Sequence, residues 1–399
     1  MTHRNSMEPI HLVFLHPHFT LPGGAGNVVL EVARRLPPDR YRVTVLCIRV
    51  SGEYRRKFPG IAFVETGGYL SNERLFWLSW PVLQRKINGI LDRLKPDVLL
   101  PSVLPANWWA FLYRRRRRNT FCLWYCHEPS AFIHSPEWQN AIDDILLRTG
   151  ARILTPLLKA IDRRLVRRNV DCALCNSRFT MDRFRKTYGI EPRGYIHPGV
   201  DLDYFSPTGE KSDYLFMISR LTRFKNVPVA IEAFSRLKNR NYRLLIGGEG
   251  EEKEALRLFV DRMGLGDRVI LTGGVAHEKL PSLYSGARVL IFTTKNEPFG
   301  MVPVEALACG TPVIASNSGG VRETVRSGFN GVLLDRMTAP SLSEAIDRLL
   351  SDSRGYDFIR RNARKSVEGF SWDRHVDRFR GFLHGALEEK SGKERRAFE

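Results

Sequence analysis

The chain has 399 residues, a length typical of about two domains, and its apolar fraction of 43% is ordinary for a globular protein. It contains no run of about 18 apolar residues, so no transmembrane helix is expected. The net charge of +19 is uneven: residues 1–196 carry 31 Lys and Arg against 16 Asp and Glu, a surplus of 15, whereas residues 197–399 carry 31 against 27, a surplus of 4. A basic surplus of this kind attracts nucleic acid, anionic lipid or phosphorylated substrates.

The N-terminal residues and the cysteines favour a cytoplasmic protein. The sequence MTHRNSMEPIHLVFLH lacks the basic and then apolar pattern of a secretion signal. The six cysteines are scattered in apolar surroundings, as is usual in a reducing compartment. Two spacings invite a zinc interpretation, Cys122-x3-Cys126-His127 and Cys172-x2-Cys175. Both pairs lie in or beside apparent buried strands, where thiols are common core residues, so no metal is expected.

The first elements predict a βαβ unit with a glycine-rich turn. Residues 10–15 and 41–48 are apolar and predict buried strands, and residues 27–36 predict the helix between them. The turn contains Gly23, Gly24 and Gly26. A glycine turn between a strand and a helix lets the backbone approach a phosphate group, although any tight turn also needs glycine.

An aromatic and strongly basic stretch follows. Residues 71–94 are apolar and aromatic, and Pro81 is predicted to break them; residues 97–100 predict a strand. After that strand, two tryptophans precede a run of arginines: Trp108, Trp109, Arg114, Arg115, Arg116, Arg117 and Arg118. This composition is typical of a contact with a membrane surface, and equally of a buried helix with a solvated basic end.

Two further elements complete the first half. Residues 120–126 predict a strand that ends at His127, and ligands bind at this end of the strands in open α/β sheets. Residues 151–169 predict a basic amphipathic helix, which faces either the core or a membrane. Its apolar residues are Ile153, Leu154, Leu157, Leu158, Ile161 and Leu165, and its flanking arginines are Arg152, Arg163, Arg164, Arg167 and Arg168.

The second half restarts an α/β pattern after a Pro-, Gly- and Asp-rich hinge. The predicted strands are residues 214–218, 243–246, 269–271 and 289–293, and the predicted helices are residues 227–237, 253–263 and 280–285. The loop after the first of these strands offers Arg220 and Lys225, and the loop after the second is GGEGEE. A last helix is predicted over residues 371–387, and residues 388–399 are expected to fray.

The segment NEPFGMVPVEAL predicts an anion site with two carboxylates. Pro303 suits the first turn of a helix that Gly300 precedes, so Gly300 and Met301 present free backbone N–H groups. Glu297 lies in the loop and Glu305 one turn into the helix, where their carboxylates can accept hydrogen bonds from sugar hydroxyls. The alternative is that Glu305 only favours the helix dipole and that Glu297 is a solvated loop residue.

These motifs together resemble the retaining GT-B glycosyltransferases of family four. The resemblance rests on the Gly23-Gly24 turn, His127, SRLTRFKN, GGEGEE, NEPFGMVPVE and GTPVIASNSGG, and it covers nearly the whole chain. It implies an α/β protein with two Rossmann-like parallel-sheet domains that face each other across a cleft. The domains would be residues 1–197, which bind the acceptor, and 213–370, which bind the nucleotide-sugar. A hinge at 198–212 would join them, and a C-terminal helix at 371–399 would pack back toward the first domain.

The resemblance also implies residue roles. The catalytic residues would be His127, Arg220, Lys225 and Glu297, with the two cations holding the departing diphosphate and Glu297 the donor sugar. His127 would face the transferred sugar and the acceptor, and Glu305 would bind the ribose hydroxyls. The remaining donor contacts would come from Gly23, Gly24, Gly248, Glu249, Val275, Phe299, Gly300, Met301 and Val302. No cofactor or metal is expected, because two basic side chains and a helix N-terminus take its place.

Within the family, WYCHEP and NEPFGMVPVEAL look like mannosyltransferases that extend lipid-linked oligosaccharides. The implied partners are GDP-mannose, a lipid-linked or glycan acceptor and an anionic membrane surface, with the enzyme peripherally bound from the cytoplasm. An alternative is a GT-B enzyme that uses a UDP-sugar and a soluble acceptor. A nucleic-acid- or lipid-binding protein is a third hypothesis, and it is disfavoured because no nucleic-acid motif accompanies the charge.

Overall fold

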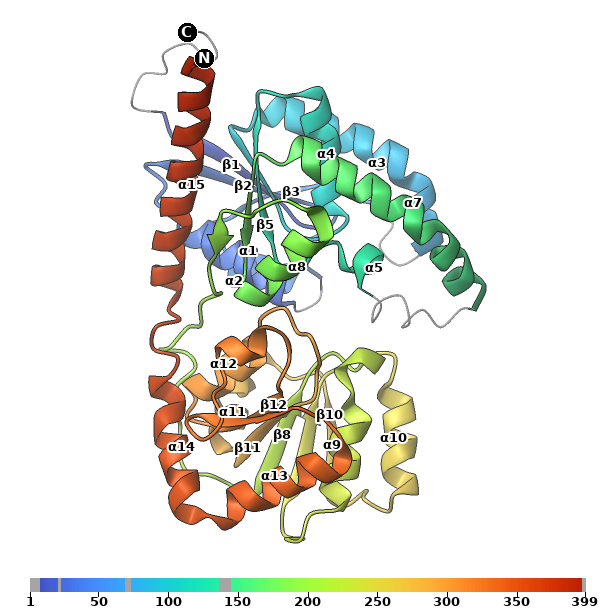
Figure 1. Cartoon of the computed structure of the whole chain (residues 1–399), viewed down its shortest axis with the longest axis vertical. Coiled ribbons are helices and arrows are strands. Elements are labelled where there is room, and N and C mark those ends of the chain that lie inside the picture. Colours follow the sequence, from blue (N-terminus) through green and yellow to red (C-terminus); the bar gives the residue numbers. More distant parts are fainter. Residues whose placement is uncertain (1–7, 21–22, 69–72, 136–144, 397–399) are drawn as a thin grey trace. The chain divides into compact units, whose positions relative to one another are not determined.

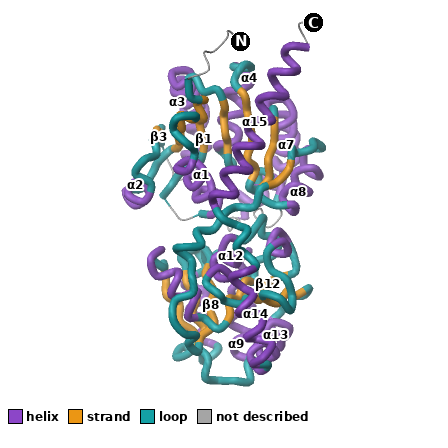
Figure 2. The backbone as a smooth tube through the Cα atoms, turned by 90° about the vertical axis from the view of Figure 1, so that its left-hand side faces the viewer, coloured by secondary structure: helices purple, strands orange, loops and turns teal. Residues whose placement is uncertain are grey.

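The computed structural model describes residues 8–20, 23–68, 73–135 and 145–396. Its contacts divide the chain into two compact units, unit 1 (Met1–His197 and Trp372–Glu399) and unit 2 (Pro198–Ser371). Each unit has one parallel sheet with helices on both faces (Figure 1, Figure 2). Residues 21–22 of the predicted glycine turn, residues 71–72, the Arg152 side chain and residues 397–399 lie outside what is described.

The sheet of unit 1 has seven parallel strands in the order β3-β2-β1-β4-β5-β6-β7. They are β1 (Ile10–Leu15), β2 (Tyr41–Cys47), β3 (Ala62–Glu65), β4 (Val98–Pro101), β5 (Phe121–Cys126), β6 (Cys172–Cys175) and β7 (Gly194–Tyr195). The central strands β1, β4 and β5 are buried almost throughout, because helices cover both faces. Their continuous apolar sequences are the pattern from which these strands are predicted.

Eight described helices belong to unit 1. They are α1 (Gly24–Arg35), α2 (Gly52–Lys57), α3 (Glu73–Leu94), α4 (Ala106–Arg116), α5 (Ala131–His134), α7 (Ile145–Asn169), α8 (Arg178–Tyr188) and α15 (Trp372–Arg396). Helix α1 begins at Gly24, three residues before the predicted start at residue 27. Pro81 lies inside α3, so the expected break is wrong. Leu83, Ile87 and Leu91 on the following turns are buried in the core. Their burial, about 1.5–3 kcal/mol each, outweighs the hydrogen bond that proline removes.

Helix α15 runs further than the sequence predicts. Fraying was expected from residue 388, but α15 continues to Arg396. Phe379 and Leu383 are buried on unit 1, and Tyr41 hydrogen-bonds to His384, with 2.6 Å between the phenol oxygen and Nε2. Beyond residue 387, the Lys390 ammonium donates to the carbonyl oxygen of Asn119 at 3.1 Å. Contacts that are distant in sequence therefore hold the end of this helix.

The sheet of unit 2 has six parallel strands in the order β10-β9-β8-β11-β12-β13. They are β8 (Tyr214–Ile218), β9 (Arg243–Gly247), β10 (Val269–Gly273), β11 (Val289–Phe292), β12 (Val313–Ser316) and β13 (Gly331–Leu334). The prediction of an α/β protein with two Rossmann-like parallel sheets is confirmed. No described helix is both long and apolar enough to cross a membrane.

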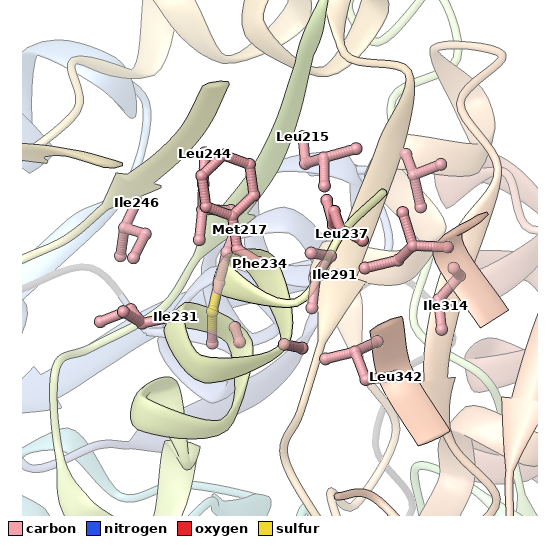
Figure 3. Close-up of a cluster of buried hydrophobic side chains, with 14 of the residues drawn as sticks. Leu215, Met217, Ile231, Phe234, Leu237, Leu244, Ile246, Ile291, Ile314 and Leu342 are labelled. Atoms are coloured by element: carbon pink, nitrogen blue, oxygen red, sulfur yellow. The ribbon is translucent and has the colours of Figure 1, made fainter. Parts of the chain in front are cut away.

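The helices of unit 2 enclose a core on the sheet. They are α9 (Val227–Ser235), α10 (Lys253–Arg262), α11 (Leu280–Gly286), α12 (Met301–Ala308), α13 (Ala339–Ser351) and α14 (Ser353–Lys365), with short 3-10 turns at Arg223–Lys225, His277–Lys279 and Gly319–Glu323. Figure 3 shows Phe234 of α9 and Leu342 of α13 among side chains of the strands, such as Met217 and Ile291. The segment expected as a hinge is tied to this unit, since the Arg364 guanidinium donates to the carbonyl oxygens of Leu202 and Phe205, each at 2.9 Å.

Candidate functional site

The two motifs with candidate cations and carboxylates meet at one edge of the unit 2 sheet. Strands β8 and β11 are neighbours, but the chain continues from β8 toward β9 and from β11 toward β12, on opposite sides. Ligands of open α/β sheets bind at the carboxyl end of such a switch point. The loops that leave this edge are residues 219–226 after β8 and residues 293–300 after β11.

An ion pair joins these two loops. The Lys225 ammonium lies 2.7 Å from Oε2 of Glu297, and both side chains are partly buried. The hydroxyl of Thr293 donates to the Lys225 carbonyl oxygen at 2.6 Å, which fixes the lysine backbone against the end of β11. Two predicted site residues that are 72 positions apart are therefore in direct contact.

Glycines let the neighbouring backbones touch. Gly248 has φ +129°, and a Cβ there would lie 1.8 Å from the carbonyl oxygen of Ser219; at Gly250 it would lie 2.2 Å from that of Leu221. The Leu221 N–H donates to the Glu249 carbonyl oxygen at 2.9 Å. The loop with Arg220 thus rests on the GGEGEE turn, and the requirement for glycine at residue 248 has a steric cause.

Gly248→Ala should therefore disturb the loop that carries Arg220. Left-handed backbone strain and overlap with Ser219 should lower the stability of unit 2 by about 2–4 kcal/mol. Differential scanning calorimetry measures this change, with Gly266→Ala as the matched control, because a Cβ at residue 266 meets open space. Equal unfolding temperatures for the two variants would contradict the steric role.

The N-terminus of α12 offers backbone N–H groups at this edge. Gly300 precedes the helix with φ +95°, and Pro303 lies in the first turn. The backbone N–H groups of Gly300, Met301 and Val302 have no acceptor among the described residues, as expected at a helix start. These groups and the helix dipole favour a bound phosphate. The Phe299 side chain is buried in the core, so only its backbone faces this edge.

Glu305 is held by a residue that the sequence did not reveal. The hydroxyl of Tyr284, on α11, donates to Oε2 of Glu305 at 2.8 Å. Burial, and then the Glu305 charge, raise the pKa of Tyr284 well above its ordinary value, so the phenol stays a neutral donor. One carboxylate oxygen is oriented in this way, while the residue remains partly exposed for a ligand. Tyr284 lies in an ordinary apolar helix, which gave no signal of this role.

The other predicted donor contacts lie at the ends of β9 and β10. The Glu249 carboxylate pairs with Lys253 at 3.0 Å and accepts the Gly274 N–H at 2.9 Å. Both contacts lower the pKa of Glu249, Lys253 the more strongly. A Cβ at Gly247 would lie 2.8 Å from Cγ2 of Val275, so that turn is closely packed. The Arg220 side chain is exposed and makes no hydrogen bond with these described residues at the ends of β9 and β10.

In unit 1, His127 lies at the carboxyl end of β5, as predicted. It is 5% exposed, and its Nε2 has no hydrogen-bond partner among the described residues. The ring centroid of Tyr125 lies 4.6 Å away. Burial, and then the proximity of His375, lower the pKa of His127 to about 3, so the imidazole is neutral near pH 7. A buried nitrogen without a partner is a group that a ligand hydroxyl can satisfy.

His16 is a second buried histidine at the carboxyl edge of the unit 1 sheet, and sequence reasoning missed it. It follows β1, and its Nδ1 lies 2.7 Å from the Ser102 hydroxyl, which follows β4. Its place after a predicted strand is the signal that identified His127.

Of the turn glycines, Gly23 precedes α1 in an extended conformation and Gly24 begins the helix. A Cβ at Gly26 would lie 3.2 Å from His16 Nε2, so Gly26 is the one that contacts the histidine.

These histidines should make unit 1 less stable in acid. Burial lowers the pKa of His16 and of His127 to about 3 and that of His375 to about 4, from an ordinary 6.5. The unfolded chain therefore binds protons more readily. The contribution of these histidines to the free energy of unfolding is fully present above pH 6.5. It falls as the pH decreases toward 4, by at most about 1.4 kcal/mol per pH unit for each histidine. The unfolding midpoint should be lower at pH 5 than at pH 7, and the difference smaller in His16→Asn. An unchanged midpoint would contradict this.

The aromatic and basic stretch proves to be part of the core of unit 1. Trp109 is fully buried, and the indole N–H of Trp108 donates to the Asp162 carboxylate at 2.5 Å. A membrane contact is therefore wrong for Trp109, because the helix turns its aromatic face to the sheet. Arg114 pairs with Asp171 and Arg117 with Asp92, each at 3.0 Å. Exposed arginines remain at the end of α4: Arg115, Arg116, Arg117 and Arg118.

Two parallel Rossmann-like sheets, one in each unit, are the architecture of the GT-B class of proteins. A family model described as Glycosyltransferase Family 4 matches residues 22–204, and one described as Glycosyl transferases group 1 matches residues 204–366. Together the two models cover most of both units. The chain belongs to this family of GT-B glycosyltransferases.

The similar sequences include D-inositol 3-phosphate glycosyltransferases. That of Salinispora tropica is 28% identical, over 92% of this chain and 82% of the relative. That of Catenulispora acidiphila is 29% identical, over 56% of this chain and 59% of the relative. That of Geodermatophilus obscurus is also 29% identical, and the chain spans 63% of its length.

Solved structures share the fold at low sequence identity. Anabaena Alr3699/HepE, crystallised with UDP and glucose, has a TM-score of 0.77 and 19% identity, covering 94% of this chain and all of that one. Sucrose-phosphate synthase of Thermosynechococcus elongatus has a TM-score of 0.78 and 21% identity, covering 96% of this chain and all of that one. At these identities the similarity establishes the fold alone.

Proposed function

We propose that the protein transfers a hexosyl group from a nucleoside diphosphate sugar to a hydroxyl group of an anionic acceptor, with retention of the anomeric configuration. The observation that carries this proposal is the Lys225–Glu297 ion pair beside the open N-terminus of α12. A cation, free N–H groups and a carboxylate at one switch point suit a molecule that joins a diphosphate to a sugar.

In this reaction the bond between the anomeric carbon and the diphosphate oxygen breaks, and a bond to the acceptor oxygen forms on the same face. The acceptor proton passes to the departing phosphate oxygen. Lys225 and the N–H groups of Met301 and Val302 stabilise the negative charge that develops on the diphosphate. Arg220, in the loop of Lys225, provides a second cation that can bind phosphate in a bidentate manner. With these groups, the transfer requires no metal.

The carboxylates bind the hydroxyl groups of the donor. Glu297 pairs with Lys225 without substrate and accepts hydrogen bonds from the sugar when the lysine turns to the phosphate. Glu305, oriented by Tyr284, binds the ribose. His127, neutral and with an Nε2 that has no partner among the described residues, offers a hydrogen-bonding group for a substrate hydroxyl in unit 1.

The donor and the acceptor have two candidate identities. The named relatives favour a UDP-hexose and a small phosphorylated acceptor, since their names specify inositol 3-phosphate and the HepE crystals contain UDP and glucose. The basic surplus of residues 1–196 favours the second, mannosyl transfer from GDP-mannose to a lipid-linked pyrophosphate at a membrane. Both acceptors are anionic, and we place the soluble acceptor first because the relatives support it.

A matrix of donors and acceptors tests the proposal. UDP-glucose, UDP-N-acetylglucosamine and GDP-mannose are each incubated with inositol 3-phosphate or a polyprenyl pyrophosphate sugar, and products are identified by mass. One donor should give a product that is heavier than its acceptor by the sugar residue of that donor, together with an equimolar amount of nucleoside diphosphate. Product on the lipid alone would select the second identity. The proposal would be contradicted if no donor gave a product and no donor released its nucleoside diphosphate.

A further inference from the structure

Helix α7 has an apolar face that is exposed in the described part of unit 1. Four residues at helical spacing form this apolar stripe: Ile153, Leu154, Leu157 and Ile161, which are 74%, 53%, 59% and 38% exposed. They form half of the eight large apolar side chains that are exposed in the described part of the chain. Such a cluster on one helix is unusual in a protein surrounded only by water.

The opposite face of α7 is anchored in unit 1. Asp162 is fully buried and accepts four hydrogen bonds, from Trp108 Nε1 at 2.5 Å, Ser130 Oγ at 3.1 Å, Tyr188 OH at 2.8 Å and His134 Nε2 at 2.8 Å. Leu165 and Val166 pack in the core on the same side. Figure 1 shows α7 beside α4, and the two helices are in contact. The apolar stripe is therefore a fixed outer surface of the unit.

A basic surface continues the apolar stripe. The last turns of α7 expose Arg163, Arg164, Arg167 and Arg168. Together with Ala160 and Ile161 they line a groove of about 630 Å³. Between residues 153 and 169 the only acidic side chain is Asp162, which is buried. The outer surface of this part of α7 thus carries apolar and positive groups without any negative charge.

We propose that this face of α7 docks on an anionic lipid surface. Apolar side chains that enter the boundary between headgroups and acyl chains, followed by arginines that meet lipid phosphates, are the features of an interfacial helix. From Ile153 to Arg168 the helix extends about 22 Å, enough to lie along the membrane. Arg163 and Arg167 also donate to the carbonyl oxygens of Thr187 and Tyr188, at 2.9 and 2.7 Å. A nucleic-acid site would not need the leucines, and a hydrophobic protein partner would not need the exposed Arg164 and Arg168.

Vesicle sedimentation tests this docking directly. The protein should sediment with phosphatidylcholine vesicles that contain phosphatidylglycerol and much less with phosphatidylcholine alone. Ile153→Glu/Leu157→Glu and, separately, Arg164→Glu/Arg168→Glu should each reduce binding at least tenfold. Leu258→Glu and Arg354→Glu are the matched controls, because both residues are exposed on unit 2, and these variants should bind like the unaltered protein.

Three outcomes would overturn the proposal: no binding to anionic vesicles, equal binding of the α7 variants, or a dimer in light scattering that only the Ile153→Glu/Leu157→Glu variant loses. The last would assign the stripe to a second copy of the chain. Tryptophan fluorescence checks that the variants fold, since α7 belongs to unit 1. The experiment needs no sugar, so its failure leaves the proposed transferase activity untouched, and docking could hold even if transfer were disproved.

Discussion

Lys225→Ala should lower kcat of sugar transfer by about 10²–10³-fold, the loss usual when one preorganised group that stabilises developing charge is removed. Its ammonium lies 2.7 Å from Glu297 at the switch point of the sheet, where the departing diphosphate is proposed to bind. The substitution also leaves the Glu297 carboxylate without its cation, so donor binding should weaken as well. Initial rates at saturating and limiting donor separate the two effects.

Lys238→Ala provides the matched control, because Lys238 is an exposed lysine of unit 2 away from this edge. Its activity should equal that of the unaltered protein. Glu297→Gln should be impaired about as severely as Lys225→Ala, and combining the two should cost less than the product of the single losses, since the residues act as a pair. Full activity of Lys225→Ala would remove Lys225 from the mechanism.

Asp162→Ala should destabilise unit 1 by about 3–5 kcal/mol. The fully buried carboxylate accepts four hydrogen bonds, and removing it leaves the donors of Trp108, Ser130 and Tyr188 buried without an acceptor. All seven tryptophans lie within the residues of unit 1, so their fluorescence during urea unfolding follows this unit alone.

Asp182→Ala serves as the comparison, since that carboxylate is half exposed and pairs with Arg185 on the surface. It should change the free energy of unfolding by less than about 1 kcal/mol. The loss of unfolding free energy in Asp162→Asn should lie between those of Asp162→Ala and Asp182→Ala, because an amide oxygen still accepts some of the hydrogen bonds. A loss below about 1 kcal/mol for Asp162→Ala would show that the buried network is not stabilising.

The central strands and the donor motifs could be predicted because their signals are local. Strands β1 and β8 begin and end at the predicted residues, since a strand buried on both faces leaves a continuous apolar run. The loops with Lys225 and Glu297 could both be assigned to strand ends. The ion pair itself could not, because the order of the strands, which sets β8 beside β11, is a property of the whole sheet.

Features that depend on distant contacts were missed or wrong. Tyr284 gave no signal because its role depends on α11 packing beside α12. The Pro81 break was wrong because core packing outweighs local propensity in α3. The frayed tail was wrong because α15 continues past residue 387, where Lys390 donates to the Asn119 carbonyl oxygen. For α7 the sequence left two orientations open, since one helix can carry both a core face and an exposed apolar face. The buried Asp162 shows which face of α7 packs in unit 1.

The most direct test of the donor site is calorimetric titration with UDP and GDP. We predict that one of them binds with one-to-one stoichiometry, and that Glu305→Gln weakens this binding by about 10–100-fold, because a charged acceptor of a ribose hydroxyl is replaced by a neutral one. Glu344→Gln, an exposed carboxylate on α13, should leave the affinity unchanged. Binding of neither nucleotide, or equal affinity of Glu305→Gln, would contradict the assignment of this edge to a nucleotide-sugar.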